Sequence, residues 1–439
     1  MRSVLLYLLL LIAFVAAILG VLRFGSDLPA AGGPQPTAIS AGSVGAATLR
    51  VLLLQIVATL LAAFAMSMLA RRLGQPGVVG EIAGGIVLGP TILGHFWPSA
   101  FNALFPPSSL GALKLLADVG VILFMFRVGL EVDLAVLRRS TRRAMVISHT
   151  SIAFPFFLGV AMSLALYRSF APAGTSFIAF ALFTGVAMAI TAFPVLARIL
   201  TEREMAATPL GQMALTCAAV DDITAWGLLA AVVAVAKGGG SGAVSMILIW
   251  SAIFAVVMVR VVRPILARTG VSDAGLVVLL FASAAATEGI GIHAVFGGFL
   301  AGVIVPLDPE QRRRWVERFS IVVPALLPLF FAYVGVRTQL TLLSDGSGIL
   351  VCLGVVVVAT VGKLGGSAFA ARATGMAWRE ALTIGALMNT RGLMELVALN
   401  IGYDLGILTP AIFAILVVMA LVTTMLTGPL LTLFGPPSS

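Results

Sequence analysis

Long apolar stretches alternate with short polar loops along nearly the whole chain. A membrane-spanning helix needs about 20 consecutive, mostly apolar residues, and stretches of that length recur from residue 50 onward. The pattern predicts an all-α polytopic membrane protein with about 13 core transmembrane helices. The predicted spans are 51–70, 78–94, 113–130, 144–167, 175–198, 211–236, 243–263, 272–287, 289–306, 319–336, 348–371, 381–402 and 410–434.

A further apolar stretch, 4–22, precedes these spans. It follows Arg2 and leads into a stretch rich in Pro, Gly and Ala at 29–46, as in a cleaved signal peptide. The apolar run is longer than a usual signal core, so a retained fourteenth helix fits equally well. The predicted organisation is therefore an N-terminal apolar segment with an extracytoplasmic linker at 1–49, followed by a membrane domain at 50–439.

Composition supports a membrane protein and excludes several other classes. Hydrophobic residues make up 60% of the chain and charged residues only 10%, whereas a soluble domain is about 25% charged. Two cysteines exclude a disulfide scaffold, and together with three histidines they argue against a zinc enzyme. The net charge of +9 comes from short basic clusters between apolar runs, which is typical of membrane loops rather than of a nucleic-acid partner.

The 27 Lys and Arg residues predict the topology. Eighteen, including Arg2, fall on one side of the predicted spans and six on the other. The remaining three, Arg127, Lys363 and Arg391, lie within spans. Because cytoplasmic loops carry the excess of basic residues, the richer side is predicted to be cytoplasmic. The C-terminus is therefore predicted to be cytoplasmic. The chain is expected in a plasma membrane, namely a bacterial inner membrane.

Two segments of the chain resemble each other, 80–88 and 297–305. At an offset of 217, Gly80 matches Gly297 and Gly85 matches Gly302. The loop charges indicate that these segments cross the membrane in opposite directions. This predicts two inverted repeats of six spans each, joined by 243–263, an architecture of secondary transporters.

The fifth span of each predicted repeat contains residues that interrupt a helix. The first holds Thr191 and Pro194, and proline frees a carbonyl one turn back. The second holds a polar run at mid-span. A proline kink and a glycine packing site explain each span alone, but equivalent positions in both repeats favour discontinuous helices, whose ends carry partial charges. The polar run of the second span consists of Asn389, Thr390, Arg391 and Gly392.

Charged residues inside predicted spans are candidates for the site. Asp221 and Asp222 lie at mid-span, where an ionised carboxylate costs at least ~2.5 kcal/mol. Neighbouring helical residues point about 100° apart, so one carboxylate can face a cation path while the other pairs. Lys363 is a candidate partner for one of them, either in transport or in a structural salt bridge. Arg391 and Glu395 share a helix face and suit a structural pair or ion coordination equally.

Glu81 lies early in its span, near the predicted cytoplasmic side. A gate and a scaffold role are equally compatible with that position.

Six segments together resemble the monovalent cation:proton antiporter-2 superfamily, and in particular the membrane domain of plant-type cation/H+ exchangers. They cover most of 50–435 in the family's order. The segments are GQPGVVGEIAGGIVLGPTILG (74–94), VGLEVD (128–133), AITAFPVLARIL (189–200), AAVDDITAW (218–226), GKLGG (362–366) and LMNTRGLMELVALNIG (387–402).

The resemblance implies a homodimer with thirteen core helices, in which a core bundle moves against a dimerisation bundle. It implies crossed discontinuous helices near Thr191 and 389–392. Asp222 matches the family's ion- and proton-binding aspartate, Asp221 the position before it, and Lys363 the conserved core lysine. Arg127 departs from the family pattern, which is usually apolar there.

These observations predict a secondary antiporter, not an enzyme, that exchanges Na+ or K+ for protons by alternating access and serves pH homeostasis. Protons and the cation would compete at Asp222, with Thr191 and freed carbonyls as further oxygen ligands. No cofactor is expected, and no metal apart from the transported cation. The expected partners are the transported ions, the lipid bilayer and a second copy of the chain.

A cation channel or uniporter without proton coupling is the main alternative. An intramembrane aspartyl protease needs carboxylates converging from separate helices, which a consecutive doublet does not provide. A receptor or scaffold remnant is the third alternative.

Overall fold

A computed structural model describes residues 2–28, 49–131, 142–237 and 241–434, and these are almost entirely α-helical. Within these described ranges, ten helices are long and apolar enough to cross a membrane, or eleven if the two parts of α16 form one span. Each of the ten overlaps a predicted span. The other three predicted spans fall on α16 (Pro309–Arg337), on the short α15 (Ala294–Ile304) and on the pair α19 (Trp378–Met388) and α20 (Leu393–Asp404). The all-helical membrane fold is confirmed, while the count of thirteen stays a prediction.

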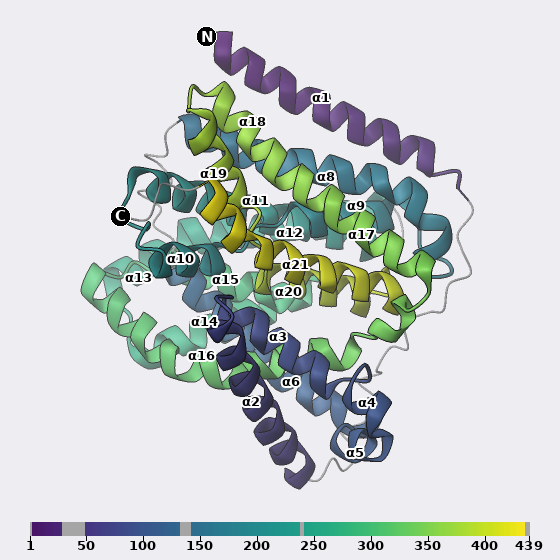
Figure 1. The fold of residues 1–439 in the computed structure, drawn as a ribbon. Coiled ribbons are helices and arrows are strands. Elements are labelled where there is room, and N and C mark those ends of the chain that lie inside the picture. The colour runs from purple at the N-terminus through teal and green to yellow at the C-terminus, as the bar shows by residue number, and fades with distance from the viewer. Residues whose placement is uncertain (1, 29–48, 132–141, 238–240, 435–439) are drawn as a thin grey trace.

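The helices pack into two bundles (Figure 1). The first bundle consists of α2, α3, α6, α14, α15 and α16, and the second bundle consists of α8–α11 and α17–α21. In the chain, α12 (Ser241–Val257) and α13 (Arg263–Thr269) connect α11 to α14. Besides α15 and α16, whose bounds are given above, the helices of the first bundle are α2 (Leu49–Arg72), α3 (Gly77–Leu88), α6 (Leu110–Glu131) and α14 (Asp273–Ile290). The second bundle contains α8 (Arg142–Phe170), α9 (Phe177–Ala189), α10 (Phe193–Glu202), α11 (Pro209–Lys237), α17 (Gly346–Thr360), α18 (Gly366–Ala373) and α21 (Pro410–Phe434).

Matched glycines let the helices of the first bundle approach closely. A Cβ on Gly80 of α3 would lie 2.2 Å from a carbonyl oxygen of α2, and a Cβ on Gly297 of α15 would lie 2.0 Å from one of α14. Gly85 of α3 meets α16 in the same way, and Gly302 of α15 meets α6. Only glycine permits such backbone contacts between helices. The two glycine pairs that the sequence aligns therefore occupy equivalent packing positions.

The N-terminal apolar stretch forms α1 (Arg2–Gly25), which lies along the outside of the second bundle (Figure 1). The ring of Phe14 packs against Phe154 and Phe157 of α8, with ring centroids 6.0 and 6.2 Å apart. The segment 4–22 is thus helical. The predicted linker 29–46 lies outside the described residues, and cleavage of the segment stays an open prediction.

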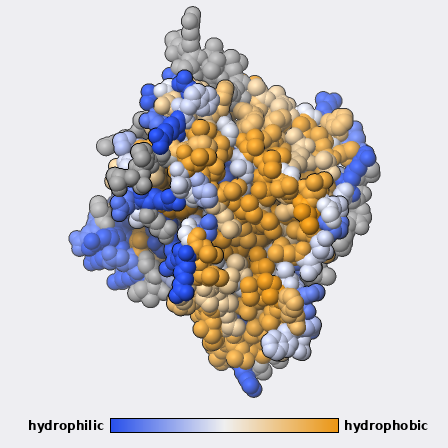
Figure 2. Space-filling model, in the orientation of Figure 1, coloured by the Kyte–Doolittle hydropathy of each residue, from blue (hydrophilic) through white to orange (hydrophobic). Residues whose placement is uncertain are grey.

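The surface is apolar where a membrane would surround it. Figure 2 shows a broad hydrophobic region across one face of the molecule, with hydrophilic residues toward its borders. Leu61 and Phe64 of α2 and Val256 of α12 are more than half exposed. In water such a surface would drive aggregation, so it indicates contact with lipid or another apolar surface.

Candidate functional site: a charged centre between two interrupted helices

Both predicted interruptions are present, and they touch each other. One break separates α9 from α10 at 190–192, and the other separates α19 from α20 at 389–392. The backbone N–H of Ala192 donates to the carbonyl of Thr390 at 3.0 Å, which joins the two breaks. Pro194 lies in the first turn of α10, where its missing N–H costs nothing. Gly392 lies beside α10, because a Cβ there would come within 3.0 Å of Val195.

Two buried basic side chains bind the C-terminal end of α9. Arg391 donates to the carbonyls of Ala187 and Met188 at 2.6 and 2.7 Å, and Lys363 donates to that of Ala189 at 2.5 Å. The last carbonyls of a helix lack partners within it and carry partial negative charge. The two basic side chains therefore donate hydrogen bonds to three buried carbonyls that the break leaves without partners in the helix.

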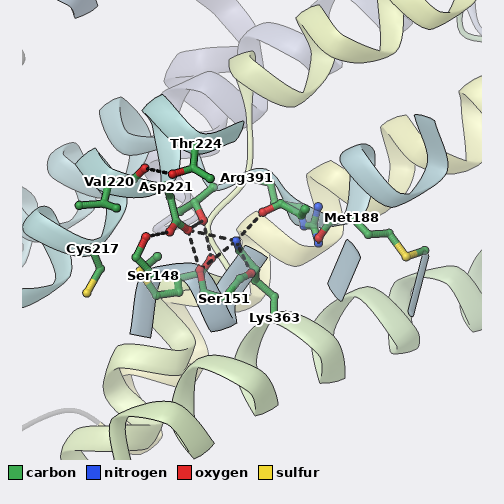
Figure 3. Close-up of polar contacts among 12 residues, drawn as sticks. Ser148, Ser151, Met188, Cys217, Val220, Asp221, Thr224, Lys363 and Arg391 are labelled. Atoms are coloured by element: carbon green, nitrogen blue, oxygen red, sulfur yellow. Dashed lines mark hydrogen bonds and ion pairs between the residues drawn. The ribbon is translucent and has the colours of Figure 1, made fainter. Parts of the chain in front are cut away.

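Asp221 of α11 is surrounded by hydrogen-bond donors (Figure 3). Ser148 of α8 donates to Oδ1 at 2.5 Å, and Ser151 donates to Oδ2 at 2.6 Å. Thr191, in the first break, also donates to Oδ2 at 2.7 Å, and Lys363 Nζ lies 3.3 Å from the same oxygen. Asp221 is fully buried, and both of its oxygens are occupied.

Asp222 has a different environment, although it is the next residue on α11. Its Oδ1 is buried and has no hydrogen-bond partner among the described residues. The backbone N–H of Phe193, at the start of α10, is directed at the carboxylate. Asp221 and Lys363 are close enough to act on it electrostatically. Of the two carboxylates, Asp222 is thus the one with an oxygen available to a ligand.

The second break is anchored to α21 by threonines. Asn389 donates to the carbonyl of Thr423 at 3.3 Å, and the backbone N–H of Arg391 donates to the Thr424 hydroxyl at 3.0 Å. Thr390 and Thr427 bring their hydroxyl oxygens to 3.5 Å.

Glu395 of α20 is fully buried, 3.5 Å from Arg391. Neither of its carboxylate oxygens has a hydrogen-bond partner among the described residues. The two residues do not share a helix face as expected, because Arg391 lies in the break and Glu395 lies in the first turn of α20. The pair lies beside the site, and its two predicted roles stay open.

A cavity of about 200 Å³ lies between the bundles next to both breaks. The first bundle contributes Glu81 and Arg127, and the second contributes Arg198 together with Ala192 and Leu393 at the breaks. Glu81 has Arg198 as an electrostatic neighbour across the gap, and Arg127 pairs with Glu131 on its own helix at 3.1 Å. Glu81 therefore lines a cavity near the site, and its predicted gate or scaffold role stays a prediction.

Away from this cavity, the bundles are bridged by a group we call the interbundle clamp: Lys114, Arg337, Asn400 and Asp404. Arg337 of α16 donates to Asn400 of α20 at 2.9 Å and forms an ion pair with Asp404 of α20. Lys114 of α6 also pairs with Asp404, at 3.0 Å. The guanidinium of Arg337 lies between the rings of Tyr333 and Tyr403, 4.5 and 4.6 Å from their centroids.

Sequence reasoning missed the serines of α8 and the threonines of α21. Ser148 and Ser151 are three residues apart and share one helix face, as do Thr423 and Thr427, four apart. Such spacings within apolar spans are a weak signal, because single hydroxyl groups in membrane helices often bond to their own backbone. The hydroxyl hydrogen of Thr191 is directed at Asp221, and the predicted role of its oxygen as a cation ligand beside Asp222 stays a prediction.

The fold and the site define an integral membrane protein with a buried charged centre between crossed helix breaks. The chain matches the transmembrane sodium/hydrogen exchanger family over residues 56–435, and it belongs to that family. The family resemblance predicted from the sequence motifs is confirmed.

Several proteins of known name are similar to the chain. The Na(+)/H(+) antiporter NhaS4 of Synechocystis is 42% identical over 89% of the chain and 98% of its own length. Cation/H(+) antiporter 19 of Arabidopsis thaliana and K(+)/H(+) antiporter 1 of Saccharomyces cerevisiae are 37% and 34% identical over 89% and 83% of the chain. The chain spans only 50% and 44% of the length of these two.

The solved structure of the sodium proton antiporter MjNhaP1 of Methanocaldococcus jannaschii superposes with a TM-score of 0.59. The superposition covers 87% of the present chain and 96% of the MjNhaP1 chain, at 14% sequence identity. At this identity the likeness shows the fold.

Proposed function

We propose that the protein is a secondary antiporter, not an enzyme, that exchanges a monovalent cation, Na+ or K+, for protons. The unequal aspartate doublet carries the proposal. Asp221 has donors on both oxygens, whereas Asp222 keeps a buried oxygen that has no partner among the described residues, beside two helix breaks. The names of the Synechocystis and yeast relatives, a Na(+)/H(+) and a K(+)/H(+) antiporter, support the same activity.

Coupling follows from a single site. A carboxylate at Asp222 binds either a proton or a cation, so the two ions compete for it. Thr191 gives its hydroxyl hydrogen to Asp221, which leaves oxygen lone pairs that suit a hard cation. Asp221 pairs with Lys363 and takes no part in the exchange. Glu81 then serves as a gate at the entrance, and the pair Arg391–Glu395 supports the breaks.

Alternating access requires that the bundles close the site from one side at a time. A cavity on one side of the breaks and the interbundle clamp on the other support this mechanism. Equivalent glycine contacts in α3 and α15 support the inverted repeat that relates the two access states. With the arginine-rich loops in the cytoplasm, the cavity faces inward and the clamp closes the outer side.

The proposed setting is a bacterial inner membrane, with the C-terminus in the cytoplasm and the chain as a homodimer. The exposed apolar faces of α2 and α12 supply surface for lipid and for a second copy.

Ion flux tests the activity. Purified protein is reconstituted in liposomes that contain a pH-sensitive dye, and Na+, K+ or Li+ is added outside. An antiporter moves the internal pH in response to the cation it accepts. A channel or uniporter passes the cation without coupled proton movement when the membrane potential is clamped, and that result would replace the proposal.

The clamp makes a prediction about sidedness. Asp404→Asn removes the negative charge that pairs with both Arg337 and Lys114, and it should favour the outward-open state. We expect the apparent affinity for the outer cation to rise, and that for the inner cation to fall, by roughly threefold to tenfold, equivalent to about 0.7–1.4 kcal/mol of shift between the states. The measurement is the cation concentration at half-maximal rate, determined from each side of oriented vesicles.

Asp273→Asn is the control, since Asp273 pairs with Arg318 within the first bundle. Equal changes on both sides for Asp404→Asn, or the same shift in the control, would show that the clamp does not bias access.

A further inference from the structure

Two serines of α8 bind the buried carboxylate of Asp221. Ser148 and Ser151 are fully buried, and each uses its single hydroxyl hydrogen for one oxygen of Asp221 (Figure 3). A hydroxyl has only one hydrogen to donate. In this arrangement both serines are therefore committed to the same carboxylate.

Ser151 also holds Lys363. Its backbone carbonyl accepts from Lys363 Nζ at 2.8 Å, and its hydroxyl oxygen lies 3.3 Å from the same nitrogen. The carbonyl of Ala189 and Oδ2 of Asp221 complete the surroundings of the ammonium group. An ammonium group has three hydrogens, so these four acceptors occupy it fully.

The consequence concerns Asp222. Lys363 Nζ lies 3.3 Å from Asp221, the residue directly before Asp222 on α11. An ammonium group that moves from Asp221 to the Asp222 carboxylate competes there with a transported cation. The carbonyls of Ser151 and Ala189 anchor the ammonium group, and the two hydroxyl donors on α8 help to fix the Asp221 carboxylate that faces it.

We infer that Ser148 and Ser151 are positioning residues that keep Lys363 on Asp221 and so leave Asp222 open to the cation. The inference rests on the proposed exchange at Asp222. It assigns α8 a part in cation affinity that neither the interrupted helices nor the charged residues account for.

The test compares Ser148→Ala, Ser151→Ala and the double variant with Ser163→Ala. Ser163 is a matched control because it is equally buried on the same helix, but its hydroxyl bonds to Gly159 of α8 itself. The assay is the initial rate against cation concentration in proteoliposomes, with the unfolding midpoint of each variant measured in parallel.

We expect the double variant to raise the cation concentration at half-maximal rate by about tenfold, the equivalent of one hydrogen bond to a charged group. The maximal rate should stay within about twofold of the unsubstituted protein, as should both parameters for Ser163→Ala. In Asp221→Asn, where Lys363 has lost its carboxylate, the serine substitutions should add no further change in affinity.

A lower unfolding midpoint with cation affinity equal to that of Ser163→Ala would reduce the serines to a structural role and overturn the inference. If the double variant does not fold, the two single variants decide by the same comparison. Asp222→Asn is run alongside. Exchange by that variant would overturn the proposed function itself, whereas an inactive Asp222→Asn with unchanged affinity in the serine variants would overturn only this inference.

Discussion

Asp222→Asn is expected to abolish cation-driven proton movement while the protein still folds. The Asn amide does not take up or release a proton at physiological pH, and it carries no negative charge to offset a bound cation. Loss of a buried charge partner costs about 3–5 kcal/mol, which corresponds to at least a hundredfold loss of exchange. The measurement is the cation-driven pH change in proteoliposomes, with folding checked by gel filtration and thermal unfolding. Exchange at the unsubstituted rate would remove Asp222 from the mechanism.

Folding should survive this substitution because Oδ1 of Asp222 has no partner to lose among the described residues. The adjacent residue provides the matched comparison. Both substitutions convert Asp to Asn on α11, one residue apart, so a difference between them reports the surroundings of each side chain.

Asp221→Asn is expected to have the opposite signature, with a large loss of stability and reduced but measurable exchange. Four donors converge on Asp221, from Ser148, Ser151, Thr191 and Lys363. An Asn amide presents hydrogens to some of them and leaves Lys363 without a counter-charge, which costs about 3–5 kcal/mol in a buried pair. The measurements are the unfolding midpoint and the exchange rate relative to Asp222→Asn. A variant unchanged in both would show that the doublet does not divide its roles.

Much of the architecture was predictable from the sequence because apolar length and loop charge are read directly from it. The two interruptions were predictable as well, since Pro194 and the run at 389–392 cannot continue a lipid-facing helix. The number of spans was less so. Helices α15 and α19 have only 11 residues each, and α20 has 12, so none crosses a membrane alone.

The site shows the same limit at finer scale. The aspartate doublet was visible as charge in an apolar span, and a pairing between Lys363 and one of its members could be suggested from composition alone. The capping of α9 by Arg391 could not be predicted in this way. It joins Arg391 to carbonyls that precede it by 204 and 203 positions in the sequence. The direction of the Thr191 hydroxyl also depends on the crossing of the breaks, a tertiary arrangement that no local pattern specifies.

The central claim is that one carboxylate takes both ions. It is tested most directly by a cation titration of the exchange rate at several pH values in proteoliposomes. If protons and the cation compete at Asp222, the cation concentration at half-maximal rate should increase by up to about tenfold for each unit that pH falls along the acid limb, because one proton is displaced per cation bound. Added cation should restore the rate there, and at fixed cation the rate should be bell-shaped in pH, since protons become scarce for the return step at high pH. An apparent cation affinity that stays constant across the acid limb would contradict the account and require separate paths for protons and cations.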